Sequence, residues 1–217
     1  MDLSFALRSN GAVRGFTNDP VGDDVVAAVL DDARFAPSGG NKQPWRVAVV
    51  HDLFIRKALG EMMRPIWQEY MGANAVGQRP FAFGRSIDAP PVDVPNMLID
   101  EIETVPVVLA IAADLRDIAI MDGNAAHRPP IVGGASIYPF CWSTLLAARA
   151  HVLGGVMTTF LARAESSAAP LLGLRADHAL AATIFLGVPV HQNTKLTRKP
   201  VESFATIDRF DGPALGG

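Results

Sequence analysis

The chain has a single cysteine, Cys141, among its 217 residues, so no intrachain disulfide can form. Sparse cysteine is typical of a reducing compartment, and the N-terminal segment MDLSFALRSN lacks the basic and then apolar pattern of a signal peptide. We therefore expect a cytoplasmic protein. The longest apolar runs, such as VPVVLAIAA at 105–113, are as long as a strand and too short to span a bilayer, so no membrane partner is expected.

Positive charge is also scarce. The chain has 19 Lys and Arg against 22 Asp and Glu, a formal net charge of −3, and no basic cluster. This excludes the basic face that a nucleic-acid partner needs. The histidines are scattered without ligand spacing, so no metal site is expected, and there is neither a P-loop nor a G-x-G-x-x-G opening a helix. An enzyme with so little acid–base and nucleophilic machinery would leave the difficult step to a cofactor.

Hydrophobic patterning predicts a single α/β or α+β domain over 1–217 with three layers. Helices are expected at 20–36, 53–72, 134–155 and 160–172, and strands at 45–51, 105–115 and 180–190. Residues 77–104 contain four prolines and no sustained period, which predicts a long surface excursion of the kind that often forms a substrate wall. Residues 191–217 form a polar tail. Charged residues make up only 19% of the chain, as if an oligomer covered additional surface.

The segment APSGGNKQPW at 36–45 combines glycine and proline with polar side chains. Gly39 and Gly40 permit positive φ and a close approach of a ligand to the backbone. Ser38, Asn41 and Gln43 supply groups that both donate and accept hydrogen bonds. This chemistry suits the edge of a planar ligand better than a phosphate. An ordinary turn after a helix is an equally good interpretation.

The same segment, extended to Val50, resembles the signature loop of the nitroreductase family of FMN-dependent homodimeric flavoproteins. Further segments resemble the family in the same order: AVRGFTNDPVGDDVVAAVLDDA (12–33), ASIYPFCWSTLLAARAHVLGGVMTTF (135–160), LLGL (171–174), LGVPV (186–190) and TRKPVESF (197–204). Only about 60–104 is unmatched. The resemblance implies an α+β fold with a mixed sheet between helices and an intertwined homodimer with FMN at the subunit interface. It also places the 134–154 helix at the dimer core and carries the tail onto the partner.

The resemblance also implies roles for individual residues. Arg14 matches a basic residue at the pyrimidine edge of the flavin, where positive charge stabilises the reduced ring. Thr158 and Thr159 match a loop at the reactive edge, although either is equally suited to capping a helix at 160. Arg198 matches a phosphate-binding arginine. The complete set of expected FMN contacts is Arg8, Asn10, Gly11, Arg14, Pro37, Ser38, Gly39, Asn41, Gln43, Thr158, Thr159, Lys195 and Arg198, with Lys199 as an alternative to Lys195 and Trp45 packed under the loop.

The sequence departs from the family pattern at two places. Asn10 and Gly11 stand where many relatives have arginine or histidine, so a phosphate ligand is missing and weaker FMN affinity is expected. Arg8 and the Gly11 N–H are the candidate substitutes. In CWST (141–144), Trp142 and Ser143 replace two amides that relatives often carry, which changes how this helix meets the partner subunit.

The expected activity is an FMN-dependent oxidoreductase that takes hydride from NADH or NADPH and passes it, in a ping-pong cycle, to a nitroaromatic or quinone. The flavin carries the chemistry, assisted by Arg14, and no dedicated catalytic residue is expected. Phe81 and Phe83, within 79–91, are the candidate wall of the acceptor pocket. Two alternatives stay open: a protein that binds or sequesters flavin without turnover, and an enzyme of this fold that catalyses another reaction, such as dehydrogenation or dehalogenation.

Overall fold

A computed structural model describes residues 2–83, 86 and 88–216. Its centre is a four-stranded sheet in the order β1 (Trp45–Val49), β2 (Val107–Asp114), β4 (His178–Gly187) and β3 (Gly154–Thr158). All three described pairings are antiparallel, where a mixed sheet was expected. Val49, the last residue of β1, pairs with Leu109 near the start of β2. The connection between the two strands therefore begins and ends at the same end of the sheet. Neighbouring strands joined in this way must run in opposite directions.

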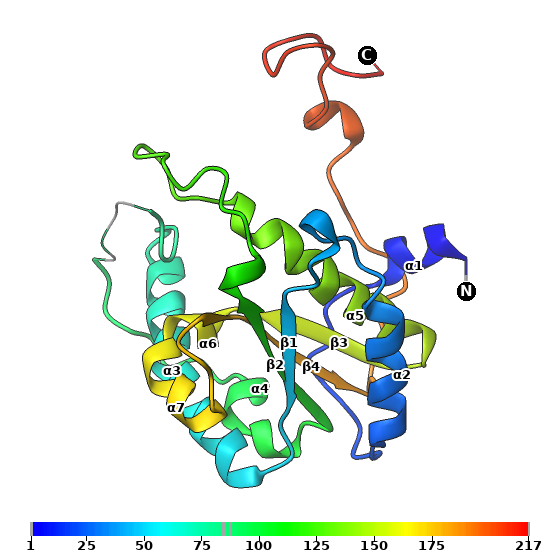
Figure 1. Ribbon diagram of the computed structural model, residues 1–217, viewed down its shortest axis with the longest axis vertical. Coiled ribbons are helices and arrows are strands. Elements are labelled where there is room, and N and C mark those ends of the chain that lie inside the picture. Colours follow the sequence, from blue (N-terminus) through cyan, green and yellow to red (C-terminus); the bar gives the residue numbers. More distant parts are fainter. Residues whose placement is uncertain (1, 84–85, 87, 217) are drawn as a thin grey trace.

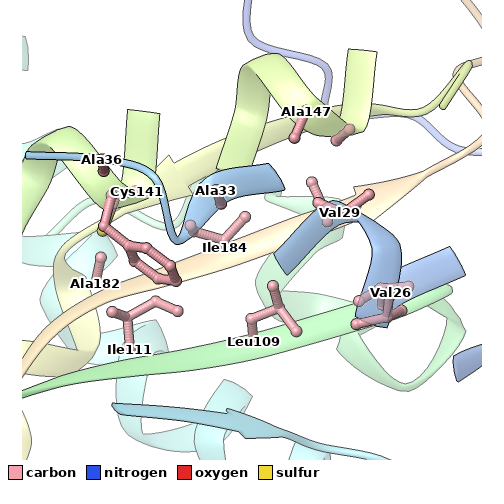
Figure 2. Close-up of a cluster of buried hydrophobic side chains, with 14 of the residues drawn as sticks. Val26, Val29, Ala33, Ala36, Leu109, Ile111, Cys141, Ala147, Ala182 and Ile184 are labelled. Carbon is pink, nitrogen blue, oxygen red and sulfur yellow. The ribbon is translucent and has the colours of Figure 1, made fainter. Parts of the chain in front are cut away.

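Helices cover both faces of the sheet, as the three-layer prediction requires (Figure 1). On one face lie α2 (Asp23–Ala33) and α5 (Tyr138–Ala150), whose apolar side chains meet the sheet in a cluster that includes Val29, Leu109, Cys141 and Ile184 (Figure 2). The opposite face packs against α3 (Leu53–Ala75), α6 (Phe160–Arg163) and α7 (Glu165–Leu172). All eight residues of β2 are buried between these layers, which confirms the strand predicted from the apolar run.

Three predicted helices have different boundaries. The helix expected at 20–36 begins at Asp23 after Gly22, without a side-chain cap. The helix expected at 53–72 continues through Pro65 to Ala75. The 160–172 helix is two short helices, α6 and α7, and the excursion contains a further turn of helix, α4 (Met97–Asp100). At the N-terminus, α1 (Leu3–Ser9) was not predicted.

The helix expected at 134–155 is the largest error. It covers only Tyr138–Ala150, and the chain then forms β3, which was not predicted. The two glycines at the start of β3 explain why this strand was not predicted, because glycine has a low propensity for strands. They are needed for packing: a Cβ on Gly155 would lie 2.7 Å from the Phe185 carbonyl oxygen, and the Leu186 side chain would be closer still.

The C-terminal segment leaves the body of the domain near α1 and extends away from it (Figure 1). Its last described hydrogen bonds to the body come from the start of the segment, where Val190 N–H donates to the Gly15 carbonyl and Gln192 Nε2 donates to the Ser9 carbonyl. Beyond Pro200 the segment folds on itself through a short bridge between Thr206 and Ala214. No helix in the described part of the chain is both long and apolar enough to cross a bilayer.

Candidate functional site

A cavity of about 750 Å³ opens where the end of β3 meets α3, α4 and the N-terminal segment. This volume lies in the range of small-molecule and cofactor sites, about 300–1,000 Å³. Val156, Met157 and Phe185 give it an apolar floor, and aromatic side chains stand at one side. The described residues that line it are Arg14, Gly15, Trp67, Tyr70, Pro95, Asn96, Met97, Leu98, Ile99, Val156, Met157, Thr158, Thr159, Phe160 and Phe185.

Three of the predicted contacts, Arg14, Thr158 and Thr159, meet at this cavity. Arg14 is exposed, and its backbone is fixed because the preceding residue, Val13, donates its N–H to the Gly155 carbonyl at 3.0 Å. The Thr158 hydroxyl is buried and has no hydrogen-bond partner among the described residues. Thr159 begins α6 but makes no side-chain cap bond, so the capping alternative is wrong for this residue. The cavity is therefore lined by the Arg14 cation and the exposed Thr159 hydroxyl, whereas the Thr158 hydroxyl points away from its accessible surface.

Sequence reasoning missed Trp67, Tyr70 and Asn96, which also line the cavity. Asn96 is the N-cap of α4 and accepts a hydrogen bond from Leu98 N–H at 3.2 Å, a role that the sequence Pro-Asn before an apolar turn could have indicated. The proposed wall at 79–91 lies elsewhere: Phe81 packs behind Tyr70, and Phe83 is exposed. Residues 84–85 and 87 of that stretch lie outside the described residues.

The signature loop, Pro37–Gln43, is fixed by its own hydrogen bonds. Gln43 N–H donates to the Ser38 hydroxyl and Gly39 N–H donates to the Ser136 hydroxyl, both at 3.0 Å. Gly40, Asn41 and Gln43 have φ of 58°, 54° and 50°, so positive φ occurs at Gly40 as expected and also at two residues with side chains. Such strain in residues other than glycine persists only where the surrounding structure imposes it. Trp45 packs beneath the loop, stacked on Phe140 with ring centroids 4.8 Å apart, as predicted.

This loop lines a different cavity, of about 590 Å³, together with the 3₁₀ turn Val132–Ser136 and residues 116–121. Pro37, Ser38 and Gly39 are at its edge, whereas Arg14 and the two threonines line the first cavity. The chain therefore gathers the predicted contacts into separate groups.

A third group surrounds a groove of about 870 Å³ between α1 and the C-terminal segment. Arg8, Arg198 and Lys199 line it, which brings together three of the cations expected at a phosphate. Lys195 is exposed and is not among the lining residues. Three neighbouring cations match the roughly −1.5 to −2 charge of a phosphate group.

Asn10 and Gly11 are arranged differently from the prediction. Gly11 N–H donates to the Ser9 carbonyl at 2.9 Å, across an inverse γ-turn centred on Asn10 at φ −81° and ψ 71°. The N–H that was a candidate phosphate donor is therefore already used. Gly11 is required by the C-terminal segment, because a Cβ here would lie 2.9 Å from the Leu196 side chain. The Asn10 side chain is buried, and its Nδ2 has no hydrogen-bond partner among the described residues.

An ion-pair network holds the end of β2 next to the signature loop. The Asp114 carboxylate is 1% exposed and accepts hydrogen bonds from Arg116 Nε at 2.8 Å and Arg46 Nη2 at 3.2 Å. Hydrogen bonding to Arg116 lowers the pKa of Asp114 to about 2. Asp114 N–H also donates to the Pro44 carbonyl, which ties the network to the exit of the loop. Burial raises the pKa of Cys141 to about 12, so this thiol is a core residue and no nucleophile.

The fold and the site define a class of protein. Residues 8–188 match the sequence profile of the nitroreductase family, and the chain belongs to that family. It is therefore an oxidoreductase of the nitroreductase type. Among the described residues, no group of three or more metal-ligating side chains is placed to hold a metal ion.

Individual relatives agree with this assignment. The chain is 25% identical to an NADH dehydrogenase of Thermus thermophilus, over 93% of this chain and 94% of the relative. A segment covering 20% of the chain is 43% identical to a nitrobenzene nitroreductase of Ectopseudomonas oleovorans, of which it covers 19%. Among solved structures, a nitroreductase from Desulfovibrio desulfuricans in complex with FMN is similar with a TM-score of 0.67, 19% identity and coverage of 97% and 99% of the two chains. An NADPH:FMN oxidoreductase of Vibrio harveyi has a TM-score of 0.66 at 17% identity, with coverage of 95% and 76%.

Proposed function

We propose that the protein transfers two electrons from NADH or NADPH to an electron-poor aromatic acceptor, a nitroaromatic or a quinone. The observation that carries this proposal is the 750 Å³ cavity, which combines an apolar lining with Arg14 and the exposed Thr159. A planar ring with one polar edge fits that combination. When bound, FMN supplies the two-electron chemistry, accepting hydride from the nicotinamide and reducing the acceptor.

Arg14 supplies positive charge to the polar edge of the ring, where reduction builds negative charge. Thr159 supplies a hydroxyl, and Asn96 lines the same cavity. In this proposal the flavin carries the chemistry, and no dedicated acid or base on the protein is required. Because nucleotide and acceptor would use the same cavity in turn, the kinetics should be ping-pong, with parallel lines in double-reciprocal plots.

A second copy of the chain completes the proposed site. In the proposed homodimer, the signature loop of one subunit reaches the Arg14 cavity of the other. This would explain why the signature loop and Arg14 line different cavities in a single chain. Large apolar side chains on α1 and the C-terminal segment are strongly exposed in the single chain, as expected of surfaces that a partner covers. Their exposed fractions are 68% for Leu3, 48% for Phe5, 47% for Leu7, 69% for Phe204 and 51% for Leu215.

The phosphate end of FMN is assigned to the groove lined by Arg8, Arg198 and Lys199. In this assignment Arg8 takes the place of the basic residue that many relatives have where this chain has Asn10. The Asn10 side chain is a buried, uncharged amide, so it does not neutralise the phosphate. The replacement predicts FMN affinity that depends strongly on Arg8. Arg8→Ala should weaken FMN binding by about tenfold, or about 1.4 kcal/mol.

The test is the absorbance spectrum of the purified protein before and after anaerobic addition of NADH or NADPH. Flavin bands that bleach with nucleotide, and return when a quinone or nitroaromatic is added, support the proposal. Bound flavin that does not bleach would instead favour a flavin-sequestering protein. Bleaching without re-oxidation by either acceptor would point to one of the other reactions of this fold.

A further inference from the structure

We propose that Trp67 and Tyr70 select the acceptor: Trp67 stacks on a planar ring, and the Tyr70 hydroxyl donates a hydrogen bond to an oxygen at its edge. The ligand class is a planar aromatic with an acceptor oxygen on its rim, as in a quinone or a nitroaromatic. This inference rests on the proposed function and adds the residues that position the acceptor.

The two residues share one face of α3, since side chains three positions apart on a helix are neighbours. Their rings are stacked, with centroids 5.9 Å apart and an angle of 11° between planes. Phe160, at the start of α6, meets both rings edge-on, at 5.8 Å from Trp67 and 5.7 Å from Tyr70. Edge-to-face and offset-stacked contacts are the favourable arrangements of aromatic pairs. These three rings therefore form a single aromatic wall on the cavity that also holds Arg14 and Thr159.

The wall is held in place by the excursion that follows α3. Trp67 Nε1 donates to the Val94 carbonyl at 2.7 Å, and Val92 N–H donates to the Gln68 carbonyl at 3.0 Å. Gly72 allows the chain to pass at this point, because a Cβ there would collide with the Pro90 carbonyl oxygen. The indole has only one donor, and Val94 uses it. Since Tyr70 stacks on the indole and Phe160 meets it at an edge, the part of the Trp67 ring that lines the cavity is what a ligand can contact.

Tyr70 differs from Trp67 in having an uncommitted polar group. Its side chain is half-buried in the wall, and its hydroxyl makes no hydrogen bond to the described residues. Phe81 packs behind the ring at 6.3 Å, and its own backbone is held at φ 51°, an unfavourable value for a bulky residue. The Arg163 guanidinium lies over the Phe81 ring, 4.1 Å from its centroid. Packing thus fixes the tyrosine while its donor remains available to a molecule in the cavity.

The first experiment measures binding without turnover. The purified protein, without reductant, is titrated with 2,3,5,6-tetramethyl-1,4-benzoquinone while tryptophan emission is recorded. We expect Trp67 emission to be quenched, Trp67→Phe to lose most of the quenching, and Tyr70→Phe to raise the Kd about tenfold, or about 1.4 kcal/mol. Tyr138→Phe removes the hydroxyl of the other tyrosine, which does not line this cavity, and should leave the Kd unchanged. An unchanged Kd in Tyr70→Phe would overturn the hydrogen bond, and quenching that survives Trp67→Phe would overturn the stacking.

The second experiment separates acceptor positioning from the proposed function. Each protein is reduced anaerobically with nucleotide and mixed with either the quinone or ferricyanide, which accepts one electron at a time and needs no aromatic wall. Tyr70→Phe should slow re-oxidation by subsaturating quinone about tenfold and leave ferricyanide unaffected. Equal slowing with both oxidants would refute the inference. Failure of the wild-type flavin to bleach would refute the proposed function instead, and the binding titration would still decide the role of the wall.

Discussion

Removing the Trp45 ring should destabilise the domain and loosen the signature loop above it. The ring is half-buried and stacks on Phe140 with an interplanar angle of 6° and centroids 4.8 Å apart. A fully buried aromatic side chain removes about 200 Å² from water, so half burial at about 25 cal/mol per Å² contributes roughly 2.5 kcal/mol. The stacked pair adds about 1 kcal/mol. Trp45→Ala should therefore lower the free energy of unfolding by about 3–4 kcal/mol, within the usual cost of such truncations.

The assay is urea unfolding followed by far-ultraviolet circular dichroism, which does not depend on the tryptophan that is removed. Protein concentration must be equal across samples, because the stability of the proposed homodimer would depend on it. Trp45→Phe retains an aromatic ring on Phe140 and should cost only about 1 kcal/mol. A loss below about 1 kcal/mol in Trp45→Ala would show that the ring does not hold the loop, and the reasoning from packing would fail.

Three further predictions concern the ion pairs, the sheet and the C-terminal segment. Because the folded-state pKa of Asp114 is lowered to about 2, its ionised carboxylate stabilises the fold above about pH 4, and this stabilisation is lost as the pH falls toward 2. In urea unfolding, Asp114→Asn should therefore be less stable than wild type at pH 7, and the difference in free energy of unfolding should narrow below pH 4. In thermal unfolding, Gly155→Ala should lower the free energy of unfolding by about 1–3 kcal/mol, because its Cβ would overlap the Phe185 carbonyl. Gly15→Ala, with open space around it, should lower it little, and equal losses in the two variants would contradict this. Deleting residues 201–217 should shift the protein from dimer toward monomer in size-exclusion chromatography with light scattering, and an unchanged mass would argue against a tail that reaches the partner.

The elements that the sequence predicted well are those whose packing depends on nearby residues. The continuous apolar run at 105–113 became the buried strand β2, because a strand covered on both faces needs apolar side chains at every position. Trp45 was expected to pack rather than to bind a ligand, and it does: as the first residue of β1, directly after the loop, it stacks on Phe140 in the core. In these cases the information lies within a few residues of the element itself.

The errors come from contacts between distant parts of the chain. Gly155 disfavours a strand by propensity, yet β3 forms because it pairs with β4, and glycine is present because Leu186 and Phe185 leave no room for a side chain. Gly11 was interpreted as a phosphate donor, but its N–H is used locally and its lack of a side chain accommodates Leu196. Trp67 looked like an ordinary apolar residue of α3, and only the fold brings Phe160 against it. No local pattern contains these neighbours.

The signature loop shows what residue types alone leave undecided. Its serine, asparagine and glutamine were selected as ligand contacts, yet the Ser38 hydroxyl accepts a hydrogen bond from the Gln43 backbone N–H, and Asn41 and Gln43 have positive φ. A loop that only ended a helix would need a single left-handed residue, usually glycine. Two strained residues with side chains, fixed by internal hydrogen bonds and by Ser136, indicate a backbone shaped in advance for a binding partner. The loop and Arg14 line different cavities, and in the proposed homodimer a single ligand would contact both.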